Sequence, residues 1–151
     1  MKPDEQPVTL EFSKITDNIY IGSNACCQIR FAEPLLKEGI TADLSLEEDH
    51  VDMPFGVSFY LWLPVPDMLP PTIDQLEVGV AYMTKVIELG HKVLVHCRWG
   101  HGRGPTMVAA YLVRTGMSVD AAIQLMTEKR PVVHIEVEQV AALRQFALRK
   151  V

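Results

Sequence analysis

The sequence predicts an α/β fold, with a central, mostly parallel and twisted sheet of four to five strands flanked by helices. Two observations carry this prediction. Short segments rich in β-branched and aromatic residues alternate along the chain with longer segments in which apolar residues recur every three or four positions. The chain has 151 residues, of which 48% are hydrophobic and 22% are charged, which is the size and balance of one globular domain over residues 1–151.

The first half of the chain supplies most of the predicted strands. The alternation of Val8, Leu10 and Phe12 with polar residues predicts a first strand, which follows a loose N-terminal end at residues 1–7. Turn-forming residues separate this strand from the elements that follow it. In chain order these are a strand over residues 19–21, a helix over 30–38, and strands over 40–46 and 57–63.

The second half is mainly helical. After a proline-rich loop at residues 64–71, Thr72 and Gln75 form a capping box that begins a helix, and Gly90 ends it. The remaining predicted elements are a strand over residues 93–95 and helices over 106–115, 118–130 and 136–150. Because parallel strands need crossover connections, we expect these helices to cover both faces of the sheet.

The charge balance excludes bulk electrostatic binding of nucleic acid. The 14 lysine and arginine residues against 19 aspartate and glutamate residues give a formal net charge of −5, whereas nucleic-acid binders neutralise phosphates with a positive excess. No N-terminal apolar run resembles a signal peptide, and no stretch approaches the ~18 apolar residues of a membrane span. We therefore expect a cytoplasmic protein with no membrane contact.

The three cysteines, Cys26, Cys27 and Cys97, are an odd number. Adjacent Cys26 and Cys27 are expected to be poor partners for each other, so no disulfide framework is predicted, which agrees with a reducing compartment. Either of them could protect Cys97 as a disulfide, but small buried side chains are the simpler interpretation.

The segment from Val95 to Thr106 carries the clearest chemical signal. It joins a buried strand to an amphipathic helix, so it lies at the carboxyl edge of the sheet, where open α/β sheets bind ligands. Its glycines let backbone N–H groups converge on an anion, and the helix N-terminus adds its positive dipole. In that field the pKa of the Cys97 thiol is expected to fall from ~8.5 to ~4–7. Arg103 offers a planar fork for two phosphate oxygens.

The pattern of His96, Cys97, five residues and Arg103 resembles the signature loop of the protein tyrosine phosphatase superfamily. Within it, the chain resembles the small atypical dual-specificity phosphatases, including the VHZ-like group and compact archaeal and bacterial relatives. The segments that carry weaker similarity are residues 16–22, 39–46, 64–67, 129–131 and 136–139. The resemblance implies a single catalytic domain of the cysteine-phosphatase (dual-specificity) fold.

The resemblance also implies residue roles. Cys97 would attack the phosphate and form a phosphocysteine, Arg103 would hold the transferring group, and Asp67 would act as general acid and then as general base. Asp67 could instead cap a turn, in which case Asp74 or Glu136 would be the substitute acid. The residues expected to surround the substrate are Arg98, Trp99, Gly100, His101, Gly102 and Arg103, and those expected to support the site are His96, Thr106, Glu136 and Gln139.

Gly104 departs from the family pattern, in which a serine or threonine follows the arginine. That hydroxyl is thought to donate to the departing thiolate, so we expect slower breakdown of the phosphoenzyme unless Thr106 compensates. Trp99 could stack on an aryl substrate or pack on a neighbouring loop. Gln139 could orient the attacking water or be an ordinary surface residue of the helix.

The expected function is hydrolysis of phosphotyrosine, and also of phosphoserine or phosphothreonine, in a phosphoprotein or phosphopeptide by a monomer. Phosphate, sulfate and vanadate are expected to bind in the loop. The alternatives are a phosphatase for phosphoinositides or other small phosphate esters, and a weakly active pseudophosphatase that binds phosphate. A rhodanese-type sulfur carrier would have a shorter loop between cysteine and arginine. No cofactor or metal is expected, because no His/Cys cluster with metal spacing is apparent in the sequence.

Overall fold

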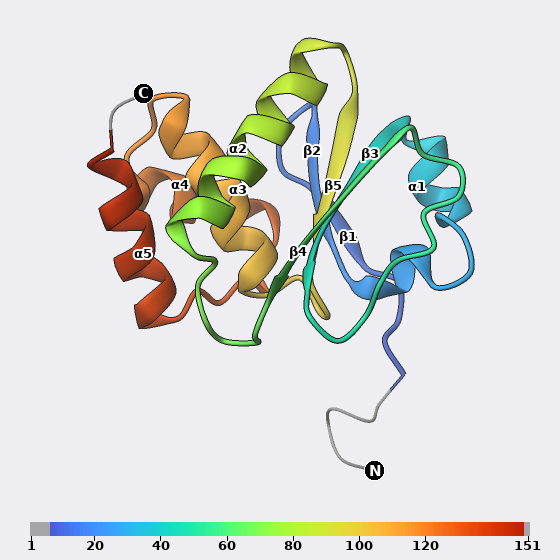
Figure 1. Cartoon of the computed structure of the whole chain (residues 1–151), viewed down its shortest axis with the longest axis horizontal. Coiled ribbons are helices and arrows are strands. Elements are labelled where there is room, and N and C mark those ends of the chain that lie inside the picture. The colour runs from blue at the N-terminus through green and yellow to red at the C-terminus, as the bar shows by residue number, and fades with distance from the viewer. Residues whose placement is uncertain (1–6, 150–151) are drawn as a thin grey trace.

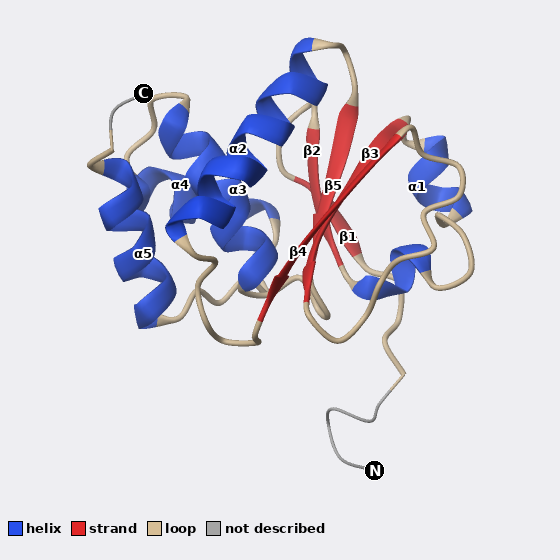
Figure 2. Cartoon of the chain, viewed as in Figure 1, coloured by secondary structure: helices blue, strands red, loops and turns tan. Residues whose placement is uncertain are grey.

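The computed structural model describes residues 7–149, and its centre is a five-stranded sheet (Figures 1 and 2). The strand order is β1-β2-β5-β3-β4; β1 is antiparallel to β2, and every other neighbouring pair is parallel. The strands are β1 (Phe12–Lys14), β2 (Ile19–Gly22), β3 (Ile40–Glu47), β4 (Phe59–Val65) and β5 (Lys92–His96). The predicted α/β fold with a mostly parallel sheet is confirmed.

Helices cover both faces of the sheet, as predicted, but unequally (Figure 1). Four helices form the larger layer: α2 (Ile73–Glu88), α3 (Arg103–Arg114), α4 (Val119–Lys129) and α5 (Val137–Ala147). The smaller layer contains the short helix α1 (Glu33–Lys37) and the 3-10 helix η2 (Asn24–Cys27). No helix among residues 7–149 is both long and apolar enough to cross a bilayer.

Alternation along the strands divides the interior into two cores. In β5, Val93 and Val95 pack into the core beneath α2–α5, while Leu94 packs with the smaller layer. In β3, the even positions from Ala42 to Leu46 face the larger core. The odd positions Asp43, Ser45 and Glu47 are polar and nevertheless buried. Since successive strand residues point to opposite faces, these polar side chains lie on the side of the smaller layer.

Several predicted boundaries move. The first strand begins at Phe12 rather than Val8, β4 extends two residues past Leu63, and the last helix ends at Ala147. Helix α3 begins at Arg103, three residues before the predicted start. It can do so because Pro105 lies in the first turn, where a missing N–H removes no intrahelical hydrogen bond. The loose end predicted at residues 1–7 lies outside the described residues except for Pro7, and so does Lys150.

The expectation that Cys26 and Cys27 would not pair was wrong, because the two form a disulfide. Both lie in η2, which the sequence did not predict, and both side chains are buried in the smaller layer. A 3-10 helix has three residues per turn, so successive side chains are ~120° apart rather than on opposite faces as in a strand. Cys97 is a free thiol, so neither neighbour protects it as a disulfide in this structure.

Candidate active site

Cys97 lies where the parallel strands end. It follows His96, the last residue of β5, which is in register with Gly22 of β2 and Ser45 of β3. Its thiol is free, and the residue is only 3% exposed. The strand register therefore places this sulfur at the carboxyl edge of the sheet, with the N-terminus of α3 a few residues further along the chain.

The backbone after Cys97 is turned so that its carbonyls face away from the loop. Four successive carbonyl groups, those of residues 98–101, accept hydrogen bonds from groups outside the loop. The donors are the Asn24 N–H to Arg98 (2.9 Å), Arg130 Nη2 to Trp99 (2.9 Å), Arg130 Nε to Gly100 (3.0 Å) and the His134 N–H to His101 (2.7 Å). With the carbonyls turned outward, the loop N–H groups are directed inward, as in an anion-binding nest.

Arg130 is the largest contributor to this arrangement, and sequence reasoning missed its role. In the sequence Arg130 belongs to the weakly similar segment at residues 129–131, and the sequence predicts no role for it in the site. The side chain is buried, holds the carbonyls of Trp99 and Gly100, and donates from Nη1 to Ser13 Oγ at 3.0 Å. It thus links the loop to β1 from outside the pocket, and we regard it as a positioning residue.

Gly100 is required by the loop itself. Its φ of +75° is a conformation that residues with a side chain rarely adopt, and a Cβ there would lie 2.7 Å from the Gly22 carbonyl oxygen. The close approach of two backbones explains the glycine at this position. Gly100 does not appear in the pocket lining, so its main part is to shape the loop.

Arg103 is the first residue of α3, and its side chain returns to the pocket. It is 3% exposed, and its Nη1 donates to the Val65 carbonyl at 2.9 Å. Its Nε is buried and makes no hydrogen bond, although it lies 3.5 Å from Asp67 Oδ1 in an ion pair. A buried charged donor without a hydrogen bond is unfavourable, so this nitrogen is available for an oxyanion.

Asp67 also lines the pocket, from the loop after β4. Its side chain is 73% exposed, and Oδ1 accepts the Met68 N–H at 2.9 Å. Gln139 fastens this loop to α5, because its Nε2 donates to the Leu69 carbonyl at 3.2 Å. Its Oε1 accepts the N–H of Glu136 at 2.8 Å, so both ends of this buried amide are engaged.

These elements enclose a pocket of about 220 Å³. It brings together eight of the predicted site residues with two that were not predicted, Met68 and His134. Five candidate residues do not line the pocket: Arg98, Gly100, His96, Thr106 and the substitute acid Asp74. The predicted residues that line it are Asp67, Cys97, Trp99, His101, Gly102, Arg103, Glu136 and Gln139.

The cations around the pocket are fewer than the sequence indicates. The Arg98 side chain lines a different cavity, together with Asn24 and Glu47. Burial, helped by the charge of Arg130, lowers the pKa of His101, which favours a neutral ring at pH 7. Arg103 is therefore the main positive side chain among the described residues that line the pocket.

Thr106 does not replace the hydroxyl that Gly104 lacks. Its Oγ1 donates to the Gly102 carbonyl at 2.7 Å, so its hydrogen is not directed to the thiol. A Cβ at Gly104 would meet backbone atoms of His96 and Val95 no closer than 3.6 Å, which is ordinary van der Waals contact. The position next to Arg103 thus has room for a serine side chain.

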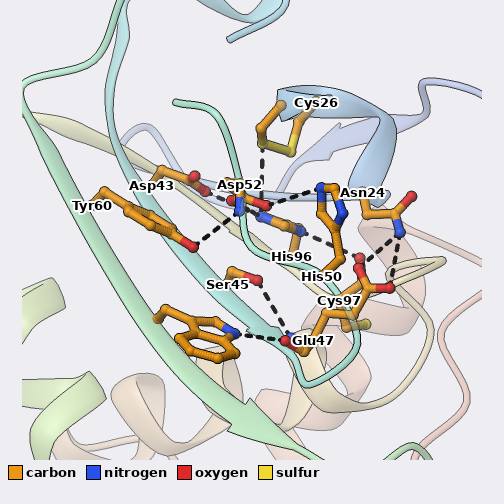
Figure 3. Close-up of polar contacts among 12 residues, drawn as sticks. Asn24, Cys26, Asp43, Ser45, Glu47, His50, Asp52, Tyr60, His96 and Cys97 are labelled. Atoms are coloured by element: carbon orange, nitrogen blue, oxygen red, sulfur yellow. Dashed lines mark hydrogen bonds and ion pairs between the residues drawn. A yellow bond between two sulfur atoms is a disulfide. The ribbon is translucent and has the colours of Figure 1, made fainter. Parts of the chain in front are cut away.

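Behind the pocket, on the side of the smaller layer, His96 is the centre of a buried polar cluster (Figure 3). Its Nδ1 lies 3.3 Å from the Cys97 carbonyl oxygen, which can only accept, so Nδ1 donates. Its Nε2 lies 2.7 Å from Asp52 Oδ2 and 3.2 Å from Asp43 Oδ1. The support expected from His96 for the loop therefore comes through the backbone of Cys97.

The protonation of this cluster is governed by burial and mutual charge. Burial disfavours a charged His96, but the two carboxylates oppose it and hold the His96 pKa well above its usual value. Burial raises the pKa of Asp43 to about 7. Burial acts in the same direction on Asp52, but hydrogen bonds from His96 and Asp43 outweigh it and lower the pKa of Asp52.

The sequence shows no His/Cys cluster with metal spacing, but the fold brings five possible metal ligands together. Cys26, Cys27, Asp43, Asp52 and His96 each place a donor atom within 4.8 Å of all the others. They come from η2, from β3, from the loop between β3 and β4, and from β5, so no short sequence motif contains them.

Comparisons with known proteins agree with this geometry. The family model described as "Polymorphic toxin system, DSP-PTPase phosphatase" matches residues 21–117. The human protein "Phosphatidylglycerophosphatase and protein-tyrosine phosphatase 1" is 39% identical over 77 residues, which are 50% of this chain and 38% of that protein. Mouse laforin is 32% identical over 88 residues, 57% of this chain and 27% of laforin. The matched region thus spans well under half of these relatives.

Solved structures extend the similarity over nearly the whole chain. The structure of PTPMT1 in complex with PI(5)P has a TM-score of 0.77 and 25% identity, covering 90% of this chain and 94% of PTPMT1. A mouse protein crystallised with zinc tungstate has a TM-score of 0.83 and 25% identity, covering 97% of this chain and 91% of the mouse chain.

Proposed function

This chain belongs to the DSP-PTPase phosphatase family of polymorphic toxin systems, and from that premise we propose that it hydrolyses phosphomonoesters through a phosphocysteine at Cys97. It is a phosphatase of the cysteine-dependent protein tyrosine phosphatase superfamily. The observation that carries the proposal is the loop over a buried thiol, with four carbonyls turned outward and the Arg103 Nε left without a hydrogen bond.

In the first step, the Cys97 thiolate attacks phosphorus while the bond from phosphorus to the leaving oxygen breaks. The loop N–H groups and Arg103 hold the equatorial oxygens, where negative charge is concentrated. Asp67, as the neutral acid, gives its proton to the leaving oxygen, which departs as an alcohol or phenol. Its high exposure and its place beside Arg103 in the pocket lining leave it accessible to a leaving group.

In the second step, water attacks the phosphorus of the phosphocysteine. The S–P bond breaks, its electron pair returns to Cys97 Sγ, and the Asp67 carboxylate takes a proton from the water. Inorganic phosphate then leaves. Since neither Gly104 nor Thr106 supplies a hydroxyl to the sulfur, this step is proposed to limit turnover.

We propose a phosphotyrosine peptide as the preferred substrate, with phosphoserine and phosphothreonine peptides also accepted. The pocket is small, and Trp99 and Met68 offer apolar contact for an aryl group. Two carboxylates, Asp67 and Glu136, line the pocket together with one buried arginine, and burial favours a neutral His101. This charge balance suits a single phosphate on a peptide better than a polyanionic headgroup.

A phospholipid or phosphoinositide substrate is the second candidate. It is favoured by the similarity to PTPMT1, whose structure was solved with PI(5)P, and to the human relative named as a phosphatidylglycerophosphatase. The fold and the loop between Cys97 and Arg103, called the phosphate loop below, would serve either substrate equally. The distinction between the two substrates therefore depends on the rim of the pocket.

A phosphate-release assay on purified protein compares three substrates: a phosphotyrosine peptide, the matched phosphoserine peptide and PI(5)P in mixed micelles. We expect the highest kcat/KM for the phosphotyrosine peptide and complete loss of release in Cys97→Ser. Higher kcat/KM for PI(5)P would reverse the order of the two candidates. Equal release by wild type and Cys97→Ser would refute the phosphocysteine, and vanadate binding without release would indicate a pseudophosphatase.

The role of Asp67 is tested by the leaving group. Asp67→Asn should slow hydrolysis of phosphoserine peptide far more than that of p-nitrophenyl phosphate, because nitrophenoxide needs little protonation to leave. Asp74→Asn is the matched control, since Asp74 does not line the pocket and should leave both rates unchanged. The comparison uses kcat/KM, which reports the first step and not the hydrolysis of the phosphoenzyme that both substrates share. An equal loss of kcat/KM on both substrates in Asp67→Asn would assign the aspartate a structural role instead.

A further inference from the structure

The buried cluster behind Cys97 contains the donor atoms of a metal site that the phosphatase chemistry does not use. Cys27 Sγ lies 3.8 Å from His96 Nε2, which also contacts Asp52 Oδ2 at 2.7 Å and Asp43 Oδ1 at 3.2 Å (Figure 3). In tetrahedral zinc sites with ~2.0–2.3 Å bonds, neighbouring ligand atoms lie ~3.3–3.6 Å apart. The three distances from His96 Nε2 bracket this spacing, and every donor lies within 4.8 Å of the others.

The buried carboxylate of Asp43 is the feature that points to a bound cation. Its side chain is fully buried in β3, and neither carboxylate oxygen makes a well-formed hydrogen bond. Its close polar neighbours are His96 Nε2, which Asp52 approaches more closely, and the Asp52 carboxyl itself. A buried carboxylate normally accepts several hydrogen bonds or binds a metal, so this one lacks a partner that a cation would supply.

The second ring nitrogen of His96 is arranged as in known metal sites. Nδ1–H donates to the Cys97 carbonyl, which leaves Nε2 directed at the two carboxylates and the sulfur. Metal-binding histidines typically fix their tautomer by such a bond to a backbone carbonyl. Zinc would replace the proton that Nε2 otherwise shares with Asp43 and Asp52.

An acidic cavity offers a route for a cation from solvent. It has a volume of about 480 Å³, and Glu47, Asp49 and His50 are among the residues that line it. His50 Nε2 lies 4.0 Å from Asp52 Oδ1, so the cavity reaches the edge of the cluster. Arg98 also lines this cavity, but the two carboxylates of Glu47 and Asp49 outnumber it, which favours a cation over an anion at the entrance.

We propose that Cys27, His96, Asp43 and Asp52 form a zinc site that is available only when the disulfide between Cys26 and Cys27 is reduced. The mixed set of thiolate, imidazole and carboxylate donors suits Zn²⁺, whereas Mg²⁺ and Ca²⁺ prefer oxygen alone. A disulfide sulfur is not a thiolate and is a poor ligand, so the bonded form in this structure is the closed state of the site.

The switch requires a named reductant. A dithiol gives two electrons and two protons to the S–S bond, which becomes two thiols, while the dithiol becomes a disulfide. Zinc binding then releases two protons to solvent, that of the Cys27 thiol and that held between His96 Nε2 and the carboxylates, as the S–Zn and N–Zn bonds form. A disulfide oxidant reverses the process by re-forming the bond to Cys26 and expelling the ion.

The test uses the full chain and zinc alone. Protein reduced with a dithiol, and protein left oxidised, are incubated with Zn²⁺, freed of unbound metal and assayed for zinc per chain. We expect one zinc in the reduced form and none in the oxidised form. With Co²⁺, the reduced form should show a thiolate-to-cobalt charge-transfer band. Excess zinc should raise the Tm of the reduced protein alone, because the metal binds the native state.

Paired variants separate this site from other zinc-binding groups. Cys27→Ser and Asp43→Asn should weaken zinc binding by more than the ~10–100-fold typical of changes outside the ligand set. Cys26→Ser should bind zinc whether or not oxidant is present, because Cys27 has lost its disulfide partner. Asp17→Asn is the matched control for Asp43→Asn, since it removes an exposed carboxylate that lines neither the cluster nor the cavity and should keep affinity close to wild type.

Cys97→Ser makes the result independent of the phosphatase proposal. This variant should lose phosphate release yet keep the zinc and the cobalt band, because Cys97 is not among the ligands. Loss of zinc in Cys97→Ser, or a reduced wild-type protein that retains no zinc and shows no rise in Tm, would overturn the site. If Asp43→Asn fails to fold, the Tm response of the wild type and the behaviour of Cys26→Ser still decide.

Discussion

Arg130 provides the sharpest test of how the phosphate loop is held. Its guanidinium is buried and holds the carbonyls of Trp99 and Gly100 at 2.9 and 3.0 Å. In Arg130→Met, a side chain of similar length fills much of the space but leaves both carbonyls without their donors. Each orphaned group costs ~1–3 kcal/mol, so we expect a total loss of about 3 kcal/mol in the free energy of unfolding.

Two measurements follow from that figure. For a chain of this length 1 kcal/mol moves Tm by ~2–4 °C, so the Tm of Arg130→Met should fall by ~6–12 °C. The freed carbonyls can rotate toward the pocket and displace N–H groups from the phosphate. Since a misplacement of ~1 Å can lower rates ~100-fold, kcat/KM for the phosphotyrosine peptide should fall by about that factor. Arg130→Lys, with a single ammonium donor group, should lie between the wild type and Arg130→Met.

Arg144→Met is the matched control. Arg144 pairs with Asp120 at 2.9 Å, but their side chains are 57% and 80% exposed. Its removal should change stability by at most ~1 kcal/mol and leave kcat/KM unaltered. If Arg130→Met loses no more stability than Arg144→Met and keeps its kcat/KM, the outward carbonyls do not depend on Arg130, and the account of the loop is wrong.

Three further predictions concern single positions. Gly104→Ser should fit, because a Cβ there has 3.6 Å of clearance, and it should speed hydrolysis of the phosphoenzyme. Stopped-flow traces should show a smaller burst and a faster steady state than the wild type. Unchanged traces would contradict the role assigned to the missing hydroxyl. Gly100→Ala should lose vanadate binding. It should also lower the free energy of unfolding by more than the ~1–2 kcal/mol of left-handed strain, because its Cβ would lie 2.7 Å from the Gly22 oxygen. Calorimetry measures the vanadate affinity and the stability, and a vanadate affinity equal to that of the wild type would refute the prediction. The Glu77 carboxylate has a lowered pKa because Arg114 donates hydrogen bonds to it. Its contribution to stability, ~0.5–1 kcal/mol, is therefore present above the ordinary glutamate pKa and lost as pH falls through the lower folded value. The stability difference between wild type and Glu77→Gln should vanish in acid, and a difference that grows there would contradict the prediction.

Features set by neighbouring residues were predictable. The capping box of Thr72 and Gln75 is present with both hydrogen bonds. Strand β5, the glycine-rich loop and the helix after it were also expected, because alternation, glycine and helical spacing are local patterns. The same locality explains why Cys97 and Arg103 could be assigned together, since only five residues separate them.

Features made by distant residues were not predictable. Arg130 and His134 reach the loop from beyond α4, and no spacing rule connects them to Trp99 or His101. The pairing of Cys26 with Cys27 depended on a 3-10 turn that propensity did not indicate. Asp43 looked like an ordinary polar residue in a strand, and only its burial beneath η2 shows that it lacks a well-formed hydrogen bond.

The sequence alone determined the alternation of strands and helices and the residues of the phosphate loop, because both depend on contacts within a few positions of the chain. The tertiary structure decided which way the loop carbonyls turn, which side chains reach the pocket, and what lies behind Cys97. These depend on strand register: the order β2-β5-β3 places His96 beside Ser45 and near Asp43. Register is a property of pairing between segments, and no single segment encodes it.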